Sequence, residues 1–262
     1  MSFKTKTIYI LAYRTGDHCN RLFQSIHYHA HCLENGYHFF NPTLVGMLNN
    51  RGLLLDQTGD FFHHFFTYFG VIIRFFVYLF QNSFLSRFFS INIVGGWDFR
   101  SHQLTTKYRQ ELSNTYSLST LLSDRERSFL SSLNSVKQNG SIILGVHVRR
   151  GDYSTWKGGI YFFNDDFYRK HIESLRLEFS SLGKSVYVIV CSNDSSPPNC
   201  GEDFLCQRSW YVDQLCLQQC DYIVGPPSTF TLWASYVASI PYVHIVDKNQ
   251  RISLSSFTIC GG

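Results

Sequence analysis

An apolar run over residues 142–148 ends in charged side chains of the kind that bind anions. His147, Arg149, Arg150 and Asp152 lie at or just after its end, in the stretch HVRRGD. Strand residues alternate between two faces, so His147 and Arg149 share a face and can point at one ligand. The planar fork of an arginine suits a phosphate, and a diphosphate leaving group gathers negative charge as its bond breaks. The stretch therefore predicts a phosphate site, with Asp152 holding Arg150 or the loop. An Arg–Asp pair that only fixes a turn is the alternative.

A second anion-binding feature lies in GPPSTFTLW, residues 225–233. Ser228 is the expected N-cap of a helix, and the amides of Thr229, Phe230 and Thr231 at the helix start can bind an anion without any positive side chain. A cap without a ligand is the alternative, because most capped helices bind nothing. Together with Arg149, however, this helix start predicts one diphosphate pocket.

Two further polar loops follow expected strands. Asp194, in CSNDSSPP, can accept hydrogen bonds from a ribose hydroxyl or from the N–H edge of guanine, although an ordinary turn fits equally well. The loop TGDHCNRLFQ places Gly16, Asn20 and Arg21 at the start of a helix. We expect this second loop to face the pocket of the other domain and close over it.

Alternating apolar and amphipathic segments predict the elements that position these residues. Expected strands cover 7–13, 37–40, 142–148, 186–191, 222–224 and 242–246, and expected helices cover 21–35, 165–182, 209–219 and 229–238. Repeated strand–helix units imply parallel sheets that bind ligands at the carboxyl ends of their strands. The turn signal KQNG at 137–140 predicts two domains, 1–138 and 139–262. The stretch 43–135 remains without a detailed assignment, apart from helical spacing over 123–133.

The composition limits the classes of protein to which this chain can belong. The chain has 262 residues, 44% of them apolar and 17% aromatic, which is enough for substantial cores. A net charge of +4 without a basic stripe argues against a nucleic-acid partner. Eight cysteines without a CxxC pair indicate reduced thiols, and the N-terminal sequence contains no secretory signal or Golgi-type anchor. We therefore expect a cytoplasmic protein.

The segment 61–91 is crowded with phenylalanine. Its uncharged runs are far shorter than the roughly 20 residues of a spanning helix, and Arg74 interrupts its centre. We expect a buried helical insertion in the first domain, because aromatic stripes usually belong to a core. Peripheral contact with the inner face of the membrane remains the alternative.

Several histidines raise the possibility of a zinc enzyme. His27, His29 and His31 follow one another at alternate positions, and His27 and His31 share a helical face. The H-E-x-x-H pattern is missing, because Tyr28 holds the place of the glutamate. The pair at 63–64 adds no recognisable ligand spacing. We therefore expect no metal.

Three stretches together resemble the superfamily of α-1,2- and α-1,6-fucosyltransferases and protein O-fucosyltransferases, particularly the bacterial family 11 α-1,2-fucosyltransferase-like proteins. HVRRGDY matches the H-x-R-R-x-D motif, CNRLFQ matches the loop G-N-Q/R-x-F-Q, and DYIVGPPSTFTLW matches S-T-F-S-x-W. Two positions depart from the family. Cys19 replaces a glycine, and Leu232 replaces a tryptophan of a candidate acceptor surface.

The resemblance implies a GT-B fold, in which two Rossmann-like domains face a cleft, with an acceptor-side N-terminal domain and a C-terminal domain that binds the GDP-sugar. It implies an inverting glycosyltransferase that uses GDP-fucose, a glycan acceptor and no required metal. The roles it implies are contact of Arg149 with the β-phosphate and of His147 and Asp194 with guanine. It also implies donor binding by Arg150, Ser228, Thr229 and Phe230 and a loop of Gly16, Asp17, His18, Asn20 and Arg21 that borders donor and acceptor.

Asp17, His18 and Asp152 are candidates for the catalytic base, and the sequence does not choose among them. Two other functions stay open on the same fold. One is a non-catalytic protein that binds a nucleotide or glycan, and the other is a glycosyltransferase with a different nucleotide sugar.

Overall fold

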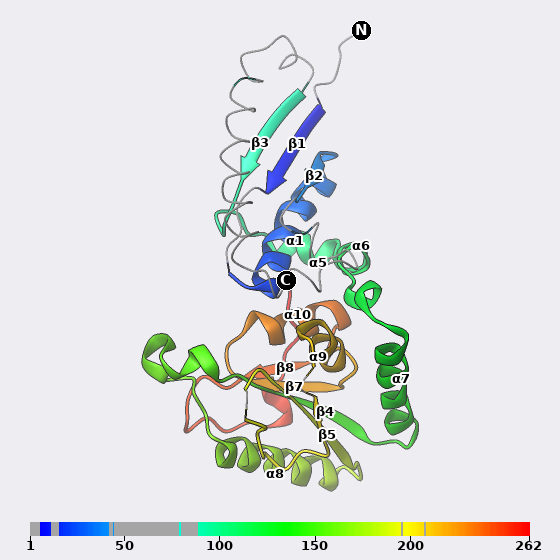
Figure 1. Cartoon of the computed structure of the whole chain (residues 1–262), viewed down its shortest axis with the longest axis vertical. Helices are drawn as coiled ribbons and strands as arrows, with labels where there is room; N and C mark the ends of the chain where they lie inside the picture. The colour runs from blue at the N-terminus through cyan, green and yellow to red at the C-terminus, as the bar shows by residue number, and fades with distance from the viewer. Residues whose placement is uncertain are drawn as a thin grey trace. The chain divides into compact units, whose positions relative to one another are not determined.

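The computed structural model describes residues 6–11, 16–41, 44, 79, 89–194, 196–206 and 208–262. These residues form two compact units, Met1–Leu121 with Gly261–Gly262, and Leu122–Cys260, and each is described by itself. Figure 1 shows both units with their element labels.

The described part of the N-terminal unit is built on a parallel sheet. Strand β1 (Lys6–Leu11) lies between β2 (His38–Phe40) and β3 (Phe89–Val94), and helix α1 (His18–Asn35) connects β1 to β2. Helix α1 ends where Gly36 adopts a left-handed conformation with φ 66°, as is common at helix ends. Helices α5 (His102–Lys107) and α6 (Arg109–Thr115) and the 3-10 turn η3 (Leu118–Leu121) follow.

Most of the aromatic segment 61–91 lies outside the described residues. Leu79 is described as helical, and residues 89–91 belong to β3 rather than to a helix. The predicted insertion and the predicted membrane contact are therefore not addressed by the described residues. Within these residues, no helix combines the length and the apolar character needed to cross a bilayer.

The boundary between the units falls earlier in the chain than the sequence predicts. It lies between Leu121 and Leu122, not at 138/139. Helix α7 (Asp124–Gln138) belongs to the C-terminal unit, where it packs against a strand and a helix of that unit. The turn at Asn139 and Gly140 joins α7 to this strand, so the expected boundary signal is an internal turn of the second unit.

The sheet of the C-terminal unit is parallel throughout its described strands, in the order β6-β5-β4-β7-β8. The strands are β4 (Ile142–Val148), β5 (Val186–Ser192), β6 (Phe204–Cys206), β7 (Tyr222–Gly225) and β8 (Tyr242–His244). Helices α8 (Asp165–Ser181), α9 (Trp210–Leu217) and α10 (Thr229–Ala238) alternate with them, and short 3-10 turns lie at Gly151–Ser154 (η4), Trp156–Gly159 (η5) and Leu254–Ser256 (η6). These parallel sheets confirm the predicted α/β class.

Strand order reverses between β4 and β7. From β4 the chain moves outward through β5 and β6 on one side, and then returns to add β7 and β8 on the other side. Ligands of open parallel sheets bind beyond the strand ends at such a reversal, because the connections there diverge to opposite faces and leave a crevice. The residues after β4 and after β7 are therefore the ones placed to share a ligand.

The two faces of β4 pack differently, as the alternation predicts. Val146 and Val148 belong to the apolar core with Phe163 and Tyr168. His147 points to the other face, where it contacts α10.

Candidate active site

The guanidinium of Arg149 lies at the carboxyl end of β4 and is fixed by two neighbours. Its Nε and Nη2 atoms lie 3.1 and 2.9 Å from Oδ1 of Asp152, and its central carbon lies 5.5 Å from the ring centroid of Tyr153. The structure thus pairs Asp152 with Arg149, whereas the sequence analysis offered Arg150 as its partner. Because a carboxylate and an aromatic ring both hold the guanidinium, its orientation is set before any ligand arrives.

Tyr153 connects Arg149 to the start of α10. Its hydroxyl donates a hydrogen bond to the carbonyl oxygen of Pro227, while its ring carries the Arg149 guanidinium. Tyr153 ends the HVRRGDY stretch, but the sequence assigns it no role, because its contacts are with residues distant in the chain. Tyr153 thus links the two predicted phosphate-binding features, the Arg149 guanidinium and the start of α10, on the same side of the sheet.

The first turn of α10 is organised by Ser228. Its backbone is extended (φ −153°, ψ 136°), and its hydroxyl accepts a hydrogen bond of 3.1 Å from the amide of Phe230. The predicted cap is therefore present, but the Phe230 amide is already used by it. The amide of Thr229, which lacks an intrahelical acceptor at this position, is the better candidate for an anion, because Thr231 is fully buried.

His244, which the sequence analysis missed, holds Ser228 from β8. Its Nε2 atom accepts a hydrogen bond of 3.4 Å from the Ser228 amide, so this nitrogen is unprotonated. Burial lowers the pKa of His244 to about 4. His244 is thus a neutral support for the helix start.

His147 is buried beneath the site. Its Nδ1 atom lies 3.2 Å from Oγ1 of Thr231, and its ring centroid lies 4.9 Å from that of Phe230. A Cβ at Gly225 would lie 3.0 Å from Cβ of His147, so glycine permits this close packing. The imidazole therefore fixes β4 to α10, and its burial differs from the predicted position against guanine.

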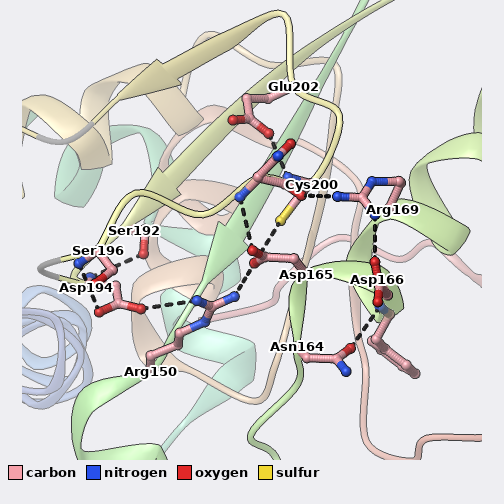
Figure 2. A network of polar contacts seen from close by, with 12 residues as sticks. Arg150, Asn164, Asp165, Asp166, Arg169, Ser192, Asp194, Ser196, Cys200 and Glu202 are labelled. Carbon is pink, nitrogen blue, oxygen red and sulfur yellow. Dashed lines mark hydrogen bonds and ion pairs between the residues drawn. The ribbon is translucent and has the colours of Figure 1, made fainter.

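Arg150 and Asp194, both predicted to bind the donor, are paired with each other (Figure 2). The Nη1 atom of Arg150 lies 3.1 Å from Oδ2 of Asp194, and Nη2 donates to Oδ1 of Asp165 at the start of α8. Asp165 also accepts from the amide of Asn199 at 3.1 Å. The Arg150 side chain is only 14% exposed. In this structure Arg150 and Asp194 tie the loops after β4 and β5 to α8, which is a structural role.

The electrostatics of this network agree with its geometry. Burial alone would raise the pKa of Asp165, yet the Asn199 amide and the Arg150 charge hold it below its ordinary value. Burial likewise opposes the charge of Arg150, but Asp165 and Asp194 raise its pKa. Asp165 and Arg150 are therefore both charged at neutral pH.

The predicted N-terminal loop belongs to the other unit. Asp17 is the N-cap residue of α1, and Gly16 before it has φ 70°. A Cβ at Gly16 would come within 2.5 Å of Nδ2 of Asn20, which accounts for the glycine. His18 begins α1, and Arg21 is buried one turn later. The expected closure of this loop over the donor remains a prediction.

The histidines of α1 have separate partners. The Nδ1 atom of His27 accepts from the amide of Ser101 at 3.1 Å, and Nδ1 of His29 lies 3.0 Å from the hydroxyl of Tyr116. Residues 63–64 lie outside the described part of the chain. Over the described part, no group of three or more His, Cys, Asp or Glu side chains is arranged to hold a metal ion.

Burial of His147 predicts a loss of stability in acid. Desolvation, reinforced by the Arg149 charge, lowers the pKa of His147 to about 3 from an ordinary 6.5. The unfolded chain takes up this proton below pH 6.5 and the folded chain does not, so the stabilisation is complete above pH 6.5 and is lost as pH falls towards 3. At pH 5 the loss from this group is about 2 kcal/mol.

Urea unfolding at pH 7 and pH 5 tests this. The stability difference between the wild type and His147→Asn should shrink by about 2 kcal/mol at the lower pH. His38→Asn, at an exposed position of β2, is the control and should leave the pH dependence unchanged. An equal pH dependence in the wild type and His147→Asn would contradict the buried neutral imidazole.

Comparison with known proteins supplies the family. Residues 96–256 match the model of "Glycosyl transferase family 11", which spans all of β4 to β8. Galactoside alpha-(1,2)-fucosyltransferase 2 of Rattus norvegicus is 25% identical over 168 residues, covering 58% of this chain and 44% of the rat protein. The enzyme of the same name from Sus scrofa is 26% identical, covering 58% of this chain and 46% of its own length. The chain thus spans less than half the length of these relatives.

Among solved structures, the alpha-1,6-fucosyltransferase NodZ, soaked with GDP-fucose, aligns with a TM-score of 0.47 and 14% identity over 98% of this chain and 99% of its own. The family model covers more than half of the chain and includes Arg149, Asp152, Tyr153 and Ser228. This chain belongs to glycosyl transferase family 11.

Proposed function

We propose that this chain transfers fucose from GDP-fucose to a hydroxyl group of a galactoside, with inversion at the sugar. The observation that carries the proposal is the shared placement of Arg149 and the α10 helix start at the reversal between β4 and β7, joined through Tyr153. Membership of family 11 and the names of the rat and pig relatives support fucose as the donor sugar and a galactoside as the acceptor.

The proposed reaction is a direct displacement. An acceptor hydroxyl attacks the anomeric carbon while the bond to the β-phosphate of GDP breaks, and the transition state resembles an oxocarbenium ion. The negative charge that develops on the departing diphosphate is met by the Arg149 guanidinium and by the amide of Thr229. Preorganised donors of this kind contribute roughly 3 to 4 kcal/mol each, because they are already oriented towards the developing charge.

Asp152 is assigned an orienting role in this proposal. Both of its contacts with Arg149 run through Oδ1, and they hold the guanidinium fork over Tyr153. Asp17 and His18 remain the candidates for the base that accepts the proton of the attacking hydroxyl. The charge on the leaving group is balanced by protein donors in this scheme, so we propose that no metal is required.

Calorimetry with GDP, UDP and GDP-fucose tests the donor. We expect GDP and GDP-fucose to bind at least tenfold more tightly than UDP. A GDP-release assay with lactose as acceptor, repeated in the presence of a chelator, then tests transfer and the need for metal. Preference for UDP would indicate another nucleotide sugar, and tight GDP-fucose binding without acceptor-dependent GDP release would indicate a non-catalytic binding protein.

A further inference from the structure

The connection between β4 and α8 exposes a group of large apolar side chains. Trp156, Ile160 and Phe162 are 39%, 51% and 36% exposed. Connections between a strand and a helix usually contain about 2 to 6 residues, and longer loops are usually functional. This connection runs from residue 149 to residue 164, and its short coils follow β4 in Figure 1. Its length and its exposed rings are therefore typical of a loop that binds a ligand.

Buried anchors and internal hydrogen bonds fix the shape of this loop. Tyr153 and Phe163 are buried on either side of the exposed residues. Between them, the amide of Gly158 donates to the carbonyl oxygen of Thr155 at 3.0 Å. The amide of Phe162 likewise donates to the carbonyl oxygen of Gly159 at 3.0 Å. The exposed rings are thus held in place before any ligand binds, which lowers the entropic cost of binding.

Lys157 adopts an uncommon backbone conformation in the middle of the loop. Its φ is 50°, in the left-handed region that a non-glycine residue occupies at some cost. Its Nζ atom lies over the Trp156 ring, 5.0 Å from the centroid, and over the Tyr161 ring, 5.8 Å from the centroid. The two rings therefore carry an ammonium donor.

The exposed rings are continuous with the candidate phosphate site. The centroid of Trp156 lies 4.8 Å from that of Tyr153 and 5.4 Å from that of Tyr161. Tyr153 carries the Arg149 guanidinium on its ring. A row of three rings, Tyr153, Trp156 and Tyr161, thus begins at the arginine that we assign to the leaving group; we name it the ring row.

We propose that the ring row binds a pyranose ring of the acceptor saccharide, with Trp156 as its main contact. This inference rests on the proposed function, whose acceptor site it specifies. A pyranose presents one face of C–H groups that packs on the negative face of an aromatic ring. Its hydroxyl edge then meets a few polar groups, here the Lys157 ammonium and the exposed Asp152 carboxylate, as in other small-molecule sites.

Charge distinguishes a saccharide from a second protein chain as the occupant. The centres of protein–protein interfaces are depleted in lysine, because burying an ammonium against apolar groups is costly. The Lys157 ammonium lies over the Trp156 and Tyr161 rings. A saccharide keeps that ammonium hydrogen-bonded, whereas a dry protein contact does not.

This loop replaces the surface first expected for the acceptor. The expected acceptor surface lies at the tryptophan position that Leu232 occupies in STFTLW. Trp233 of that motif is fully buried in α10. The exposed aromatic surface near Arg149 is instead in the β4–α8 connection.

Titration calorimetry of lactose with the GDP-loaded protein tests the proposal. Trp156→Ala should weaken lactose binding about tenfold and raise the acceptor KM by a similar factor, while the GDP affinity stays within twofold. Trp156→Phe, which keeps a ring, should stay within about threefold of the wild type. The matched control is Leu177→Ala on α8, whose side chain is 73% exposed, and it should change neither value.

The outcomes separate this inference from the proposed function. Loss of lactose binding in Trp156→Ala, in a protein that transfers no fucose, would support the ring row and reject the reaction. Unchanged lactose binding in Trp156→Ala, or no lactose binding by the wild type, would overturn the ring row even if fucose is transferred. A wild-type dimer that becomes monomeric in Trp156→Ala during sedimentation would likewise overturn it, in favour of a contact between copies.

Discussion

Arg149→Lys is expected to lower kcat by roughly 100- to 1,000-fold, the usual cost of removing one preorganised donor to a developing charge. Lysine keeps the positive charge but lacks the planar fork, so it cannot hold Asp152 and a phosphate oxygen in the same orientation. The present contacts of Nε and Nη2 with Asp152, at 3.1 and 2.9 Å, would both be lost. Steady-state GDP release at saturating lactose and GDP-fucose measures the effect.

Asp152→Asn serves as the companion variant. Its amide oxygen can still accept a hydrogen bond from Arg149 without the negative charge, so we expect a loss much smaller than that of Arg149→Lys. Urea unfolding of both variants shows whether the fold is intact. A kcat for Arg149→Lys near that of the wild type would rule out a leaving-group role for Arg149.

Arg150→Met is expected to cost about 3–5 kcal/mol in free energy of unfolding, because it leaves the carboxylates of Asp165 and Asp194 without their buried partner. The Arg150 side chain is 14% exposed and lies between the two carboxylates in Figure 2. Substitutions of these neighbouring arginines should therefore have different effects. Arg149 variants should have a lower kcat, and Arg150 variants should have a lower free energy of unfolding. Urea unfolding at pH 7 measures the effect.

Arg169→Met is the matched control, since Arg169 pairs with an Asp166 side chain that is 82% exposed. Exposed pairs of this kind contribute at most about 1 kcal/mol. A stable Arg150→Met protein that no longer binds GDP would contradict the structural role of Arg150 and would indicate that Arg150 binds the donor.

The sequence predicted best the elements whose boundaries are set locally. Strand β4 occupies 142–148 as expected, because a continuous apolar run bounded by a glycine turn and by arginines allows few alternatives. Helix α10 occupies 229–238 as expected, because Ser228 is a strong N-cap preceded by two prolines. These two elements border the strand-order reversal.

The missed elements lack such local signals. Strand β6 has three residues, Phe204–Cys206, and is defined only by its pairing with β5. Strand β3, FSINIV, does alternate between apolar and polar residues, but its first residues were counted with the aromatic segment 61–91, which is expected to be helical. The Asn139–Gly140 turn resembles a domain boundary in sequence, but contacts of α7 with β4 place it inside the second unit.

The partners of the two arginines could not be predicted from their neighbours in sequence. Arg149 and Arg150 are adjacent, and Asp152 is within reach of either. The position of Asp165 determines which ion pairs form. Helix α8 brings the Asp165 carboxylate to Arg150, so Asp152 pairs with Arg149. Tyr153 and His244 were missed for the same reason, since each acts through a contact with residues distant in sequence.

The central claim is that the Arg149 guanidinium and the amides that open α10 bind one diphosphate. The position of GDP in a crystal structure of the complex tests this most directly. We expect β-phosphate oxygens within hydrogen-bond distance of Arg149 and of the amide of Thr229. A diphosphate that contacts neither group, or only one of the two with the other facing away, would contradict the account.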